Sequence, residues 1–66
     1  MNITLNNKEI TLSEGTTLQE LILEQNLPTQ NIAVAVNNTL ILHDKWCTTS
    51  LCEGDKVVAI VAAYGG

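Results

Sequence analysis

Residues 56–66 read KVVAIVAAYGG, in which seven apolar residues, 57–63, are followed by Tyr64 and two glycines. A strand with one face in water alternates between apolar and polar residues, whereas this run is apolar at every position. Such a run is typical of a strand that lies in the middle of a sheet. We therefore expect residues 57–63 to form a central strand, flanked by strands from the rest of the chain.

The first twelve residues predict a β-hairpin. Apolar and polar residues alternate over residues 1–5, and the alternation resumes at Ile10 and Leu12 after Asn7 and Lys8. Two short alternating segments joined by a few turn-forming residues are typical of two antiparallel strands.

One helix is expected after this hairpin. Thr17 and Glu20 have the spacing of a capping box, and Thr16 and Gln19 offer the same spacing one residue earlier. Three apolar residues then fall on one helix face: Leu18, Leu21 and Ile22. An asparagine and a proline within residues 26–28 are signals for the helix end. We expect a helix of about ten residues that covers one face of the sheet.

A second hairpin is predicted by residues 32–36, an apolar run closed by Asn37-Asn38, with residues 40–42 as the returning strand. Residues 43–55 are polar and are expected to be irregular. The resulting order of elements has no repeated alternation of strand and helix. It predicts an α+β fold with a mixed sheet of about five strands and one main helix on one face. The last strand, if central, is expected to pair in parallel with the first.

Length and charge limit the classes of function. Sixty-six residues support one core, so we expect a single domain over residues 1–66, with residues 63–66 as a flexible C-terminal tail. Seven acidic residues against three lysines give a net charge of -4, which disfavours a nucleic-acid partner. The start of the chain has no secretory signal, and the longest apolar run is far shorter than the ~20 residues that span a bilayer. We expect a cytoplasmic protein with no membrane partner.

The final residues, Gly65-Gly66, indicate chemistry rather than folding. Glycine has no Cβ, so a diglycine tail can enter a channel that is too narrow for side chains. The terminal carboxylate of Gly66 then becomes the candidate reactive group. This carboxylate is ionised at neutral pH and must be activated before a nucleophile can attack it. The alternative is that the glycines are only a frayed, solvated end.

Five segments, taken in order, make a more specific pattern than any one of them. They are Ile3-Thr4-Leu5-Asn6, Thr16-Thr17-Leu18, Ala33-Val34-Ala35-Val36-Asn37, Glu53-Gly54-Asp55 and Gly65-Gly66. With this set the chain resembles, from end to end, the ThiS family of sulfur carrier proteins of thiamine biosynthesis. One region departs from the family pattern. Many such carriers have a Pro-Arg pair shortly before the tryptophan, whereas here Leu42-His43-Asp44-Lys45 precede Trp46.

The resemblance implies a ubiquitin-like β-grasp fold and a role as a cosubstrate rather than an enzyme. A ThiF-type adenylating enzyme would use ATP to convert the Gly66 carboxylate to an acyl-adenylate, and sulfur would then replace AMP. The resulting thiocarboxylate would donate sulfur to a ThiG-type thiazole synthase. Ala63, Tyr64 and Gly65 would form the tail that the partners bind. The carrier itself would hold no cofactor.

Three alternatives remain open. The small subunit of molybdopterin synthase shares the fold and the diglycine, but it tends to be longer and to carry prolines where this chain has Ala62-Ala63-Tyr64. A ubiquitin-like modifier would join the same terminus to lysines of target proteins. A plain interaction domain would have an inert tail.

The remaining candidates lie in residues 43–52. His43, Cys47 and Cys52 offer a partial zinc pattern, but they lack paired short spacings and a convincing fourth ligand, so no metal site is expected. Both cysteines are expected to fill the edge of the core as small side chains. Trp46 is expected to cover the core edge, with a role as a partner anchor as the alternative. Any docking surface is expected on the sheet face that the helix leaves open.

Overall fold

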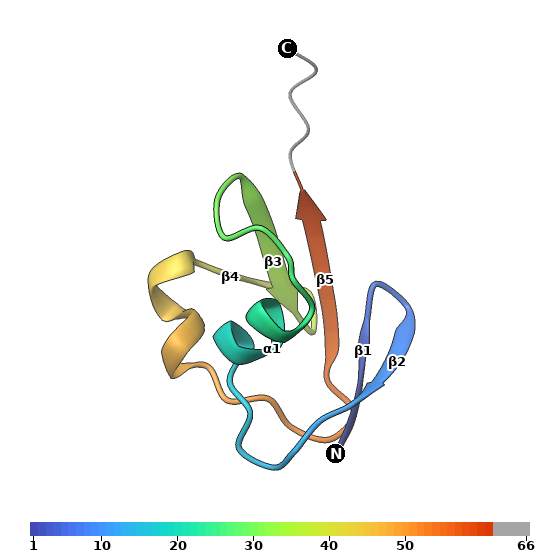
Figure 1. Cartoon of the computed structure of the whole chain (residues 1–66). Coiled ribbons are helices and arrows are strands. Elements are labelled where there is room, and N and C mark those ends of the chain that lie inside the picture. The colour runs from blue at the N-terminus through green and yellow to red at the C-terminus, as the bar shows by residue number, and fades with distance from the viewer. Residues whose placement is uncertain (62–66) are drawn as a thin grey trace.

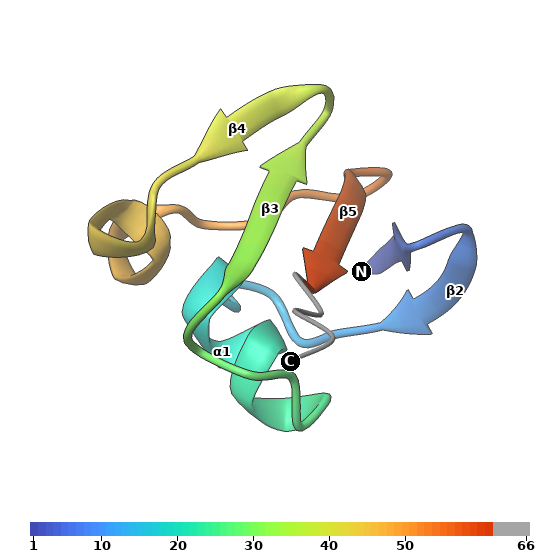
Figure 2. The same ribbon diagram turned by 90° about the horizontal axis from the view of Figure 1, so that it is seen from above.

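The computed structural model describes residues 1–61, so residues 62–66 lie outside the described part of the chain. In chain order the elements are β1 (Asn2–Leu5), β2 (Lys8–Thr11), α1 (Leu18–Glu24), β3 (Ile32–Val36), β4 (Thr39–Ile41), the 3-10 helix η1 (His43–Thr48) and β5 (Lys56–Val61). The five strands form one sheet in the order β2-β1-β5-β3-β4 (Figures 1 and 2). No helix within residues 1–61 is long and apolar enough to cross a membrane.

β5 is the central strand, as its apolar sequence predicts. It runs parallel to β1 and antiparallel to β3, so the predicted mixed sheet and the pairing of the first and last strands are confirmed. Val57 and Ala59 are buried on the face that α1 covers. The strand was expected to reach residue 63, but residues 62 and 63 lie outside the described part.

Both hairpins turn on a pair of asparagines. The backbone φ angles are 51° at Asn6 and 68° at Asn7, and 51° at Asn37 and 69° at Asn38. Two adjacent positive φ angles are the signature of the type I′ turn, whose twist matches that of the flanking strands. The first turn thus lies one residue earlier than expected, because asparagine tolerates this conformation better than Lys8 does.

α1 begins at the predicted capping box. The Thr17 side chain accepts a hydrogen bond from the backbone of Glu20, whose side chain in turn accepts one from the backbone of Thr17. Thr16 is not the cap, since its hydroxyl donates to the carbonyl of Ser13 at 2.8 Å.

The helix has seven residues rather than about ten, because the backbone of Asn26 turns to a φ of 56° directly after the C-cap. The N–H groups of Asn26 and Leu27 donate to the carbonyls of Leu23 and Ile22, and this pair of bonds closes the helix as a Schellman motif.

A single core lies between α1 and the sheet, and η1 closes one side of it (Figure 2). Its buried apolar residues are Ile3, Leu5, Leu12, Leu18, Leu21, Ile22, Val34, Trp46, Leu51, Val57 and Ala59. Trp46 is 2% exposed and its Nε1 donates to the Ile41 carbonyl at 3.1 Å, so its predicted place at the core edge is confirmed. The expectation of an irregular segment over residues 43–48 was wrong, because burying Trp46 draws this segment into a 3-10 helix.

Candidate functional site

The candidate site begins where β5 ends. Val61 is the last described residue, and the four predicted site residues, Ala63, Tyr64, Gly65 and Gly66, all lie outside the described part of the chain. The structure therefore defines the base from which the predicted tail starts, namely the C-terminal half of β5 (Figure 1).

The two edges of β5 are held very differently by backbone pairing. On the β3 side the pairing runs along most of the strand, from Val36 opposite Val57 to Ile32 opposite Val61. On the β1 side only two pairs form, at Lys56 and Val57. The backbone bonds on that side run from Thr4 N–H to the Asp55 carbonyl at 3.0 Å and from Asn6 N–H to the Val57 carbonyl at 2.9 Å. Beyond Val57, β1 has turned away.

The side chain of Asn6 takes over at that point. Its Oδ1 accepts a hydrogen bond from the Ala59 N–H at 2.8 Å, and its Nδ2 donates to the Ala59 carbonyl at 3.1 Å. The backbone N–H of Asn6 thus bonds to the Val57 carbonyl, and the side-chain amide of Asn6 bonds to the Ala59 carbonyl, the next one on this edge of β5. The carboxamide of Asn6 acts as an extra unit of strand β1, placed on an otherwise open stretch of β5.

Asn37, the first residue of the other hairpin turn, holds the opposite end of β5. Its backbone N–H donates to the Lys56 carbonyl at 2.8 Å, and its Oδ1 accepts from the Lys56 N–H at 3.0 Å. Its Nδ2 donates to the Asp55 carboxylate at 3.0 Å, and that carboxylate also accepts from the Cys52 N–H at 2.8 Å. Two equivalent turn residues therefore clamp β5, one near each end.

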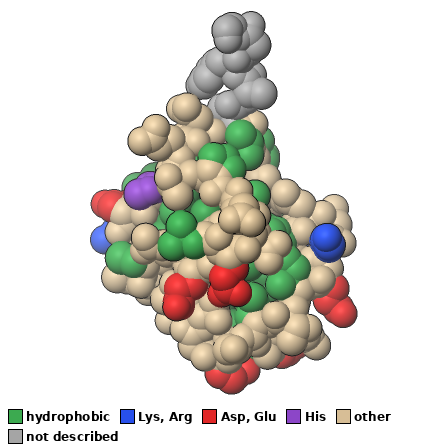
Figure 3. Space-filling model, in the orientation of Figure 1, with side chains coloured by type: hydrophobic (Ala, Val, Ile, Leu, Met, Phe, Trp, Pro, Cys, Tyr) green, Lys and Arg blue, Asp and Glu red, His purple; other side chains and the backbone are tan. Residues whose placement is uncertain are grey.

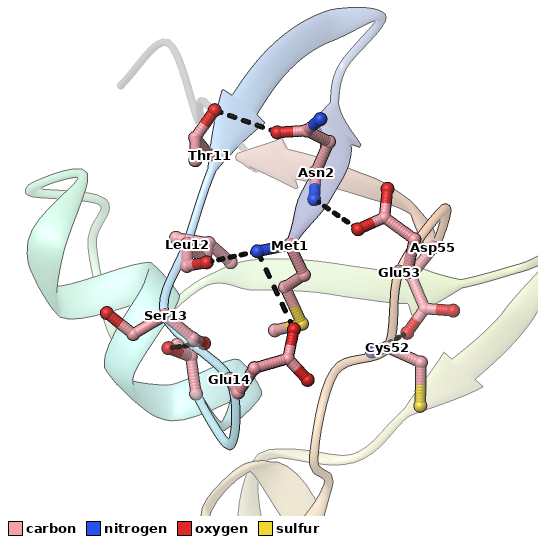
Figure 4. Close-up of polar contacts among 10 residues, drawn as sticks. Met1, Asn2, Thr11, Leu12, Ser13, Glu14, Cys52, Glu53 and Asp55 are labelled. Carbon is pink, nitrogen blue, oxygen red and sulfur yellow. Dashed lines mark hydrogen bonds and ion pairs between the residues drawn. The ribbon is translucent and has the colours of Figure 1, made fainter.

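Further polar contacts tie the segment before β5 to the first hairpin (Figure 4). The Asn2 N–H donates to Glu53 Oε1 at 2.9 Å. The nitrogen of Met1 donates to the Leu12 carbonyl at 2.6 Å and lies 3.7 Å from the Glu14 carboxylate. The Gly54 N–H donates in turn to the Asn2 carbonyl at 2.7 Å, so two contacts of Asn2 tie the segment before β5 to β1, while the contacts of Met1 join the start of the chain to residues 12 and 14.

The open face of the sheet carries an apolar strip. The register places Leu40 beside Ala35 and Val58 in one row, and Ala33 beside Ile60 in the next. Leu40 is 61% exposed and Ile60 is 64% exposed, so the two largest side chains of these rows lie in solvent. This strip, defined by these five residues, is called the open-face strip below.

The register also settles which residues of the two central strands face the helix. Ile3, Leu5, Val57 and Ala59 are buried there, whereas Val61 is 47% exposed at the end of its strand. Figure 3 shows hydrophobic side chains at the surface close to the start of the grey segment, and acidic side chains further down the same face.

Both cysteines are free and exposed, so the prediction that Cys47 and Cys52 fill the core edge was wrong. Trp46 and Leu51 supply the buried apolar groups of this region instead, and the cysteines lie on the solvent side. The His43 ring lies against the Trp46 ring with centroids 4.4 Å apart. Within residues 1–61, no three His, Cys, Asp or Glu residues form a group that could hold a metal ion, and no pocket is found.

The roles of Asn6 and Asn37 were not anticipated from the sequence. The signal that was available is the Asn-Asn pair, which occurs at both hairpin turns. That pair indicates a type I′ turn, but it does not show where the side chains bond. The bonded partner of Asn6 lies 53 residues away along the chain, so only the sheet topology reveals it.

Comparison with known proteins supports the expected family. The model of the ThiS family matches residues 1–66. A crystal structure of the thiamine biosynthesis protein ThiS from Geobacter metallireducens has a TM-score of 0.84 and 25% sequence identity, with 100% of each chain covered. A solution structure of a thiamine biosynthesis protein from the same organism has a TM-score of 0.81 and 25% identity, and covers 100% of this chain and 88% of that one. No curated protein matched. The likeness to these structures confirms the expected β-grasp fold.

Proposed function

Because the chain belongs to the ThiS family over residues 1–66, we propose that it is a sulfur carrier of thiamine biosynthesis and that the sulfur is carried on the carboxyl group of Gly66. The family match is the observation that carries this proposal, since it includes the diglycine. The β-grasp core supports it by providing a rigid base for residues 62–66. On this view the chain is a cosubstrate and not a catalyst.

The chemistry proceeds in two steps on the partner enzyme. A carboxylate oxygen of Gly66 attacks the α-phosphorus of ATP, which forms an acyl-adenylate and releases pyrophosphate. A sulfur nucleophile then attacks the Gly66 carbonyl carbon, so that a C–S bond forms, the C–O bond to AMP breaks and AMP leaves. The thiocarboxylate later gives its sulfur to thiazole synthase.

The chain contributes position rather than acid or base groups to these steps. Holding two reactants in a productive geometry lowers the entropic part of the barrier, and a rigid domain that docks on the enzyme supplies this. We propose that the open-face strip is the surface that docks on the adenylating enzyme. Ile60 belongs to both the strip and β5, so docking there would bring the base of the tail next to the enzyme.

The test is intact-protein mass spectrometry after incubation with ATP, a ThiF-type adenylating enzyme and a sulfide source. We expect a mass gain that fragmentation locates at Gly66. Fragmentation is essential, because exchanging oxygen for sulfur and oxidising one sulfur atom give nearly the same nominal gain. The exposed thiols of Cys47 and Cys52 make such oxidation a real risk.

The matched control for this test is the Cys47→Ser/Cys52→Ser double variant, which should gain the same mass. A chain that gains no sulfur with an enzyme active on its own carrier would contradict the proposal. Conjugates of higher mass that depend on Gly66 would instead indicate a protein modifier. Stable co-purification with a large catalytic subunit would indicate the molybdopterin synthase alternative.

A further inference from the structure

We propose that Asn6 is a positioning residue for sulfur transfer. Its side-chain amide keeps the C-terminal half of β5 in the sheet, and so fixes the base from which the tail enters the adenylating enzyme. This inference rests on the function proposed above. The observation that carries it is the pair of hydrogen bonds between the Asn6 side chain and the backbone of Ala59.

β5 needs support on its β1 side. The backbone pairing with β1 stops at Val57, while β5 continues to Val61. Over this last stretch Ile60 is 64% exposed and Val61 is 47% exposed, so burial holds the strand end only weakly. The β3 edge and the Asn6 amide are then the contacts that keep this end in place.

The Asn6 amide is fixed in place. The φ of 51° places the residue in the type I′ turn, and its backbone N–H is already bonded to the Val57 carbonyl at 2.9 Å. Few degrees of freedom remain for the side chain, so little further entropy is lost when it bonds to Ala59. Both the donor and the acceptor of the carboxamide are used, and no other residue type combines this short donor–acceptor pair with tolerance of a positive φ.

The clamp affects the reaction through the fraction of carriers that present the tail correctly. If the end of β5 leaves the sheet in some molecules, only the remaining fraction presents the tail correctly to the enzyme. The apparent affinity of the carrier is then multiplied by that fraction, whereas a carrier that is already bound reacts at the normal rate. Loss of the clamp should therefore raise KM for the carrier and leave kcat nearly unchanged.

The chain offers matched controls. Asn7 has the same turn conformation, with a φ of 68°, and its side chain makes no hydrogen bond within residues 1–61. Asn37 also uses both groups of its amide at the opposite end of β5: its Oδ1 accepts from the Lys56 N–H, and its Nδ2 donates to the Asp55 carboxylate directly before the strand. Asn7→Gly thus controls for the turn, and Asn37→Gly controls for loss of a comparable pair of hydrogen bonds far from the tail.

Two measurements test the proposal on the full chain. The first is amide hydrogen exchange of the free carrier. Since N–H groups alternate along a strand, the N–H of Ile60 points toward β3 and is not itself bonded to Asn6. We expect Asn6→Gly to speed the exchange of the Ile60 N–H by about tenfold, because two hydrogen bonds are lost. In Asn7→Gly and Asn37→Gly, the exchange of this N–H should change only as much as the free energy of unfolding of each variant changes.

The second measurement is the steady-state kinetics of Gly66 activation with the adenylating enzyme. We expect Asn6→Gly to raise KM for the carrier, by less than the roughly tenfold change expected for opening of the strand end, with kcat nearly unchanged. Asn6→Asp keeps the size and the turn tolerance of the residue but sets an oxygen against the Ala59 carbonyl. We expect it to behave like Asn6→Gly, whereas Asn7→Asp, with the same added charge, should behave like the unaltered chain.

Each outcome decides the matter. Unchanged exchange at Ile60 in Asn6→Gly would show that the clamp does not hold the strand, and would overturn the inference. If Asn6→Gly speeds exchange at Ile60 but has the same KM and kcat as Asn37→Gly, the positioning role is overturned and Asn6 is only a stabilising residue. If the unaltered chain gains no sulfur with an active enzyme, the proposed function fails, and with it the part of Asn6 in the reaction. The exchange experiment separates that failure from a failure of the clamp, because it needs no partner.

Discussion

At the scale of single residues, Gly65 is the position where the proposed chemistry is most sensitive to a side chain. We expect Gly65→Val to leave the free energy of unfolding unchanged and to abolish adenylation, because a branched Cβ would block entry of the tail into a narrow channel. Gly65→Ala should retain part of the activity, since it adds a single methyl group. Pyrophosphate exchange measures adenylation, and circular dichroism checks the fold. Near-normal activation of Gly65→Val would refute the narrow-channel argument.

Trp46 is a residue whose value is structural. We expect Trp46→Phe to lower the free energy of unfolding by ~1–3 kcal/mol, because it removes the donor to the Ile41 carbonyl and part of a buried ring. Urea unfolding should be followed by circular dichroism, because Trp46 is the only tryptophan and its fluorescence is lost in this variant.

The control for this variant is Leu42→Ala, at a side chain that is 61% exposed, which should change the free energy by no more than about 0.5 kcal/mol. Equal losses for the two variants would contradict the assignment of Trp46 to the core.

The burial of a small side chain is harder to predict from sequence than that of a large one. Cys47 and Cys52 were placed in the core edge on size and apolarity alone, yet both are exposed. Small side chains fit either environment, so the sequence around them does not decide their burial. Trp46 was placed correctly, because a large apolar ring gains much more from burial than a thiol does.

At the scale of the elements, β5 packs on the core with one face and belongs to the proposed docking surface with the other. Val57 and Ala59 face the core, while Val58 and Ile60 belong to the open-face strip. We expect Ile60→Lys to leave the free energy of unfolding nearly unchanged, since the side chain is 64% exposed, and to weaken binding to the adenylating enzyme. Isothermal titration calorimetry measures the affinity.

Leu42→Lys is the matched control for this change. Leu42 is 61% exposed and the added charge is the same, but the residue lies outside the sheet, directly before η1. Its affinity for the enzyme should remain close to that of the unaltered chain. Equal losses of affinity in both variants would show that added charge, rather than the open-face strip, controls binding.

Elements with strong local signals were predicted well. β3 was predicted with its observed bounds, because its apolar run ends at an Asn-Asn pair, which favours a type I′ turn. The start of α1 was found from its capping box, whereas its end was placed too late, because the positive φ of Asn26 stops the helix within one residue. η1 was missed, since the burial of one tryptophan against a distant sheet leaves no repeating pattern over six residues.

At the scale of the whole molecule, the net charge of -4 provides a further test. We expect the association rate with the adenylating enzyme to fall as ionic strength rises, because long-range attraction to a basic surface is screened by salt. Stopped-flow kinetics at several salt concentrations measure this rate. The dissociation rate should change much less, since the open-face strip is apolar. An association rate that is independent of salt would exclude electrostatic steering.

The fold as a whole could be predicted, but the contacts that hold the tail base could not. The central place of β5 and its parallel pairing with β1 followed from its apolar run, and the two hairpins followed from their turn residues, whereas the pairing of β5 with β3 was not predicted. The clamp by Asn6 links residues that are far apart in the sequence, and its side-chain geometry depends on where β1 ends relative to β5. Residues 62–66 carry the proposed chemistry, and for them the diglycine and the family match remain the basis.

The sheet order has a consequence for how the molecule is made. The β1–β2 hairpin and the β3–β4 hairpin do not pair with each other, and β5 lies between them. During synthesis on the ribosome, both hairpins emerge before the strand that joins them, so the native sheet must wait for residues 56–61. Contacts between such distant segments form slowly. Changes at Val57 or Ala59, the buried residues of β5, should therefore slow the folding of the newly made chain as well as lower its stability.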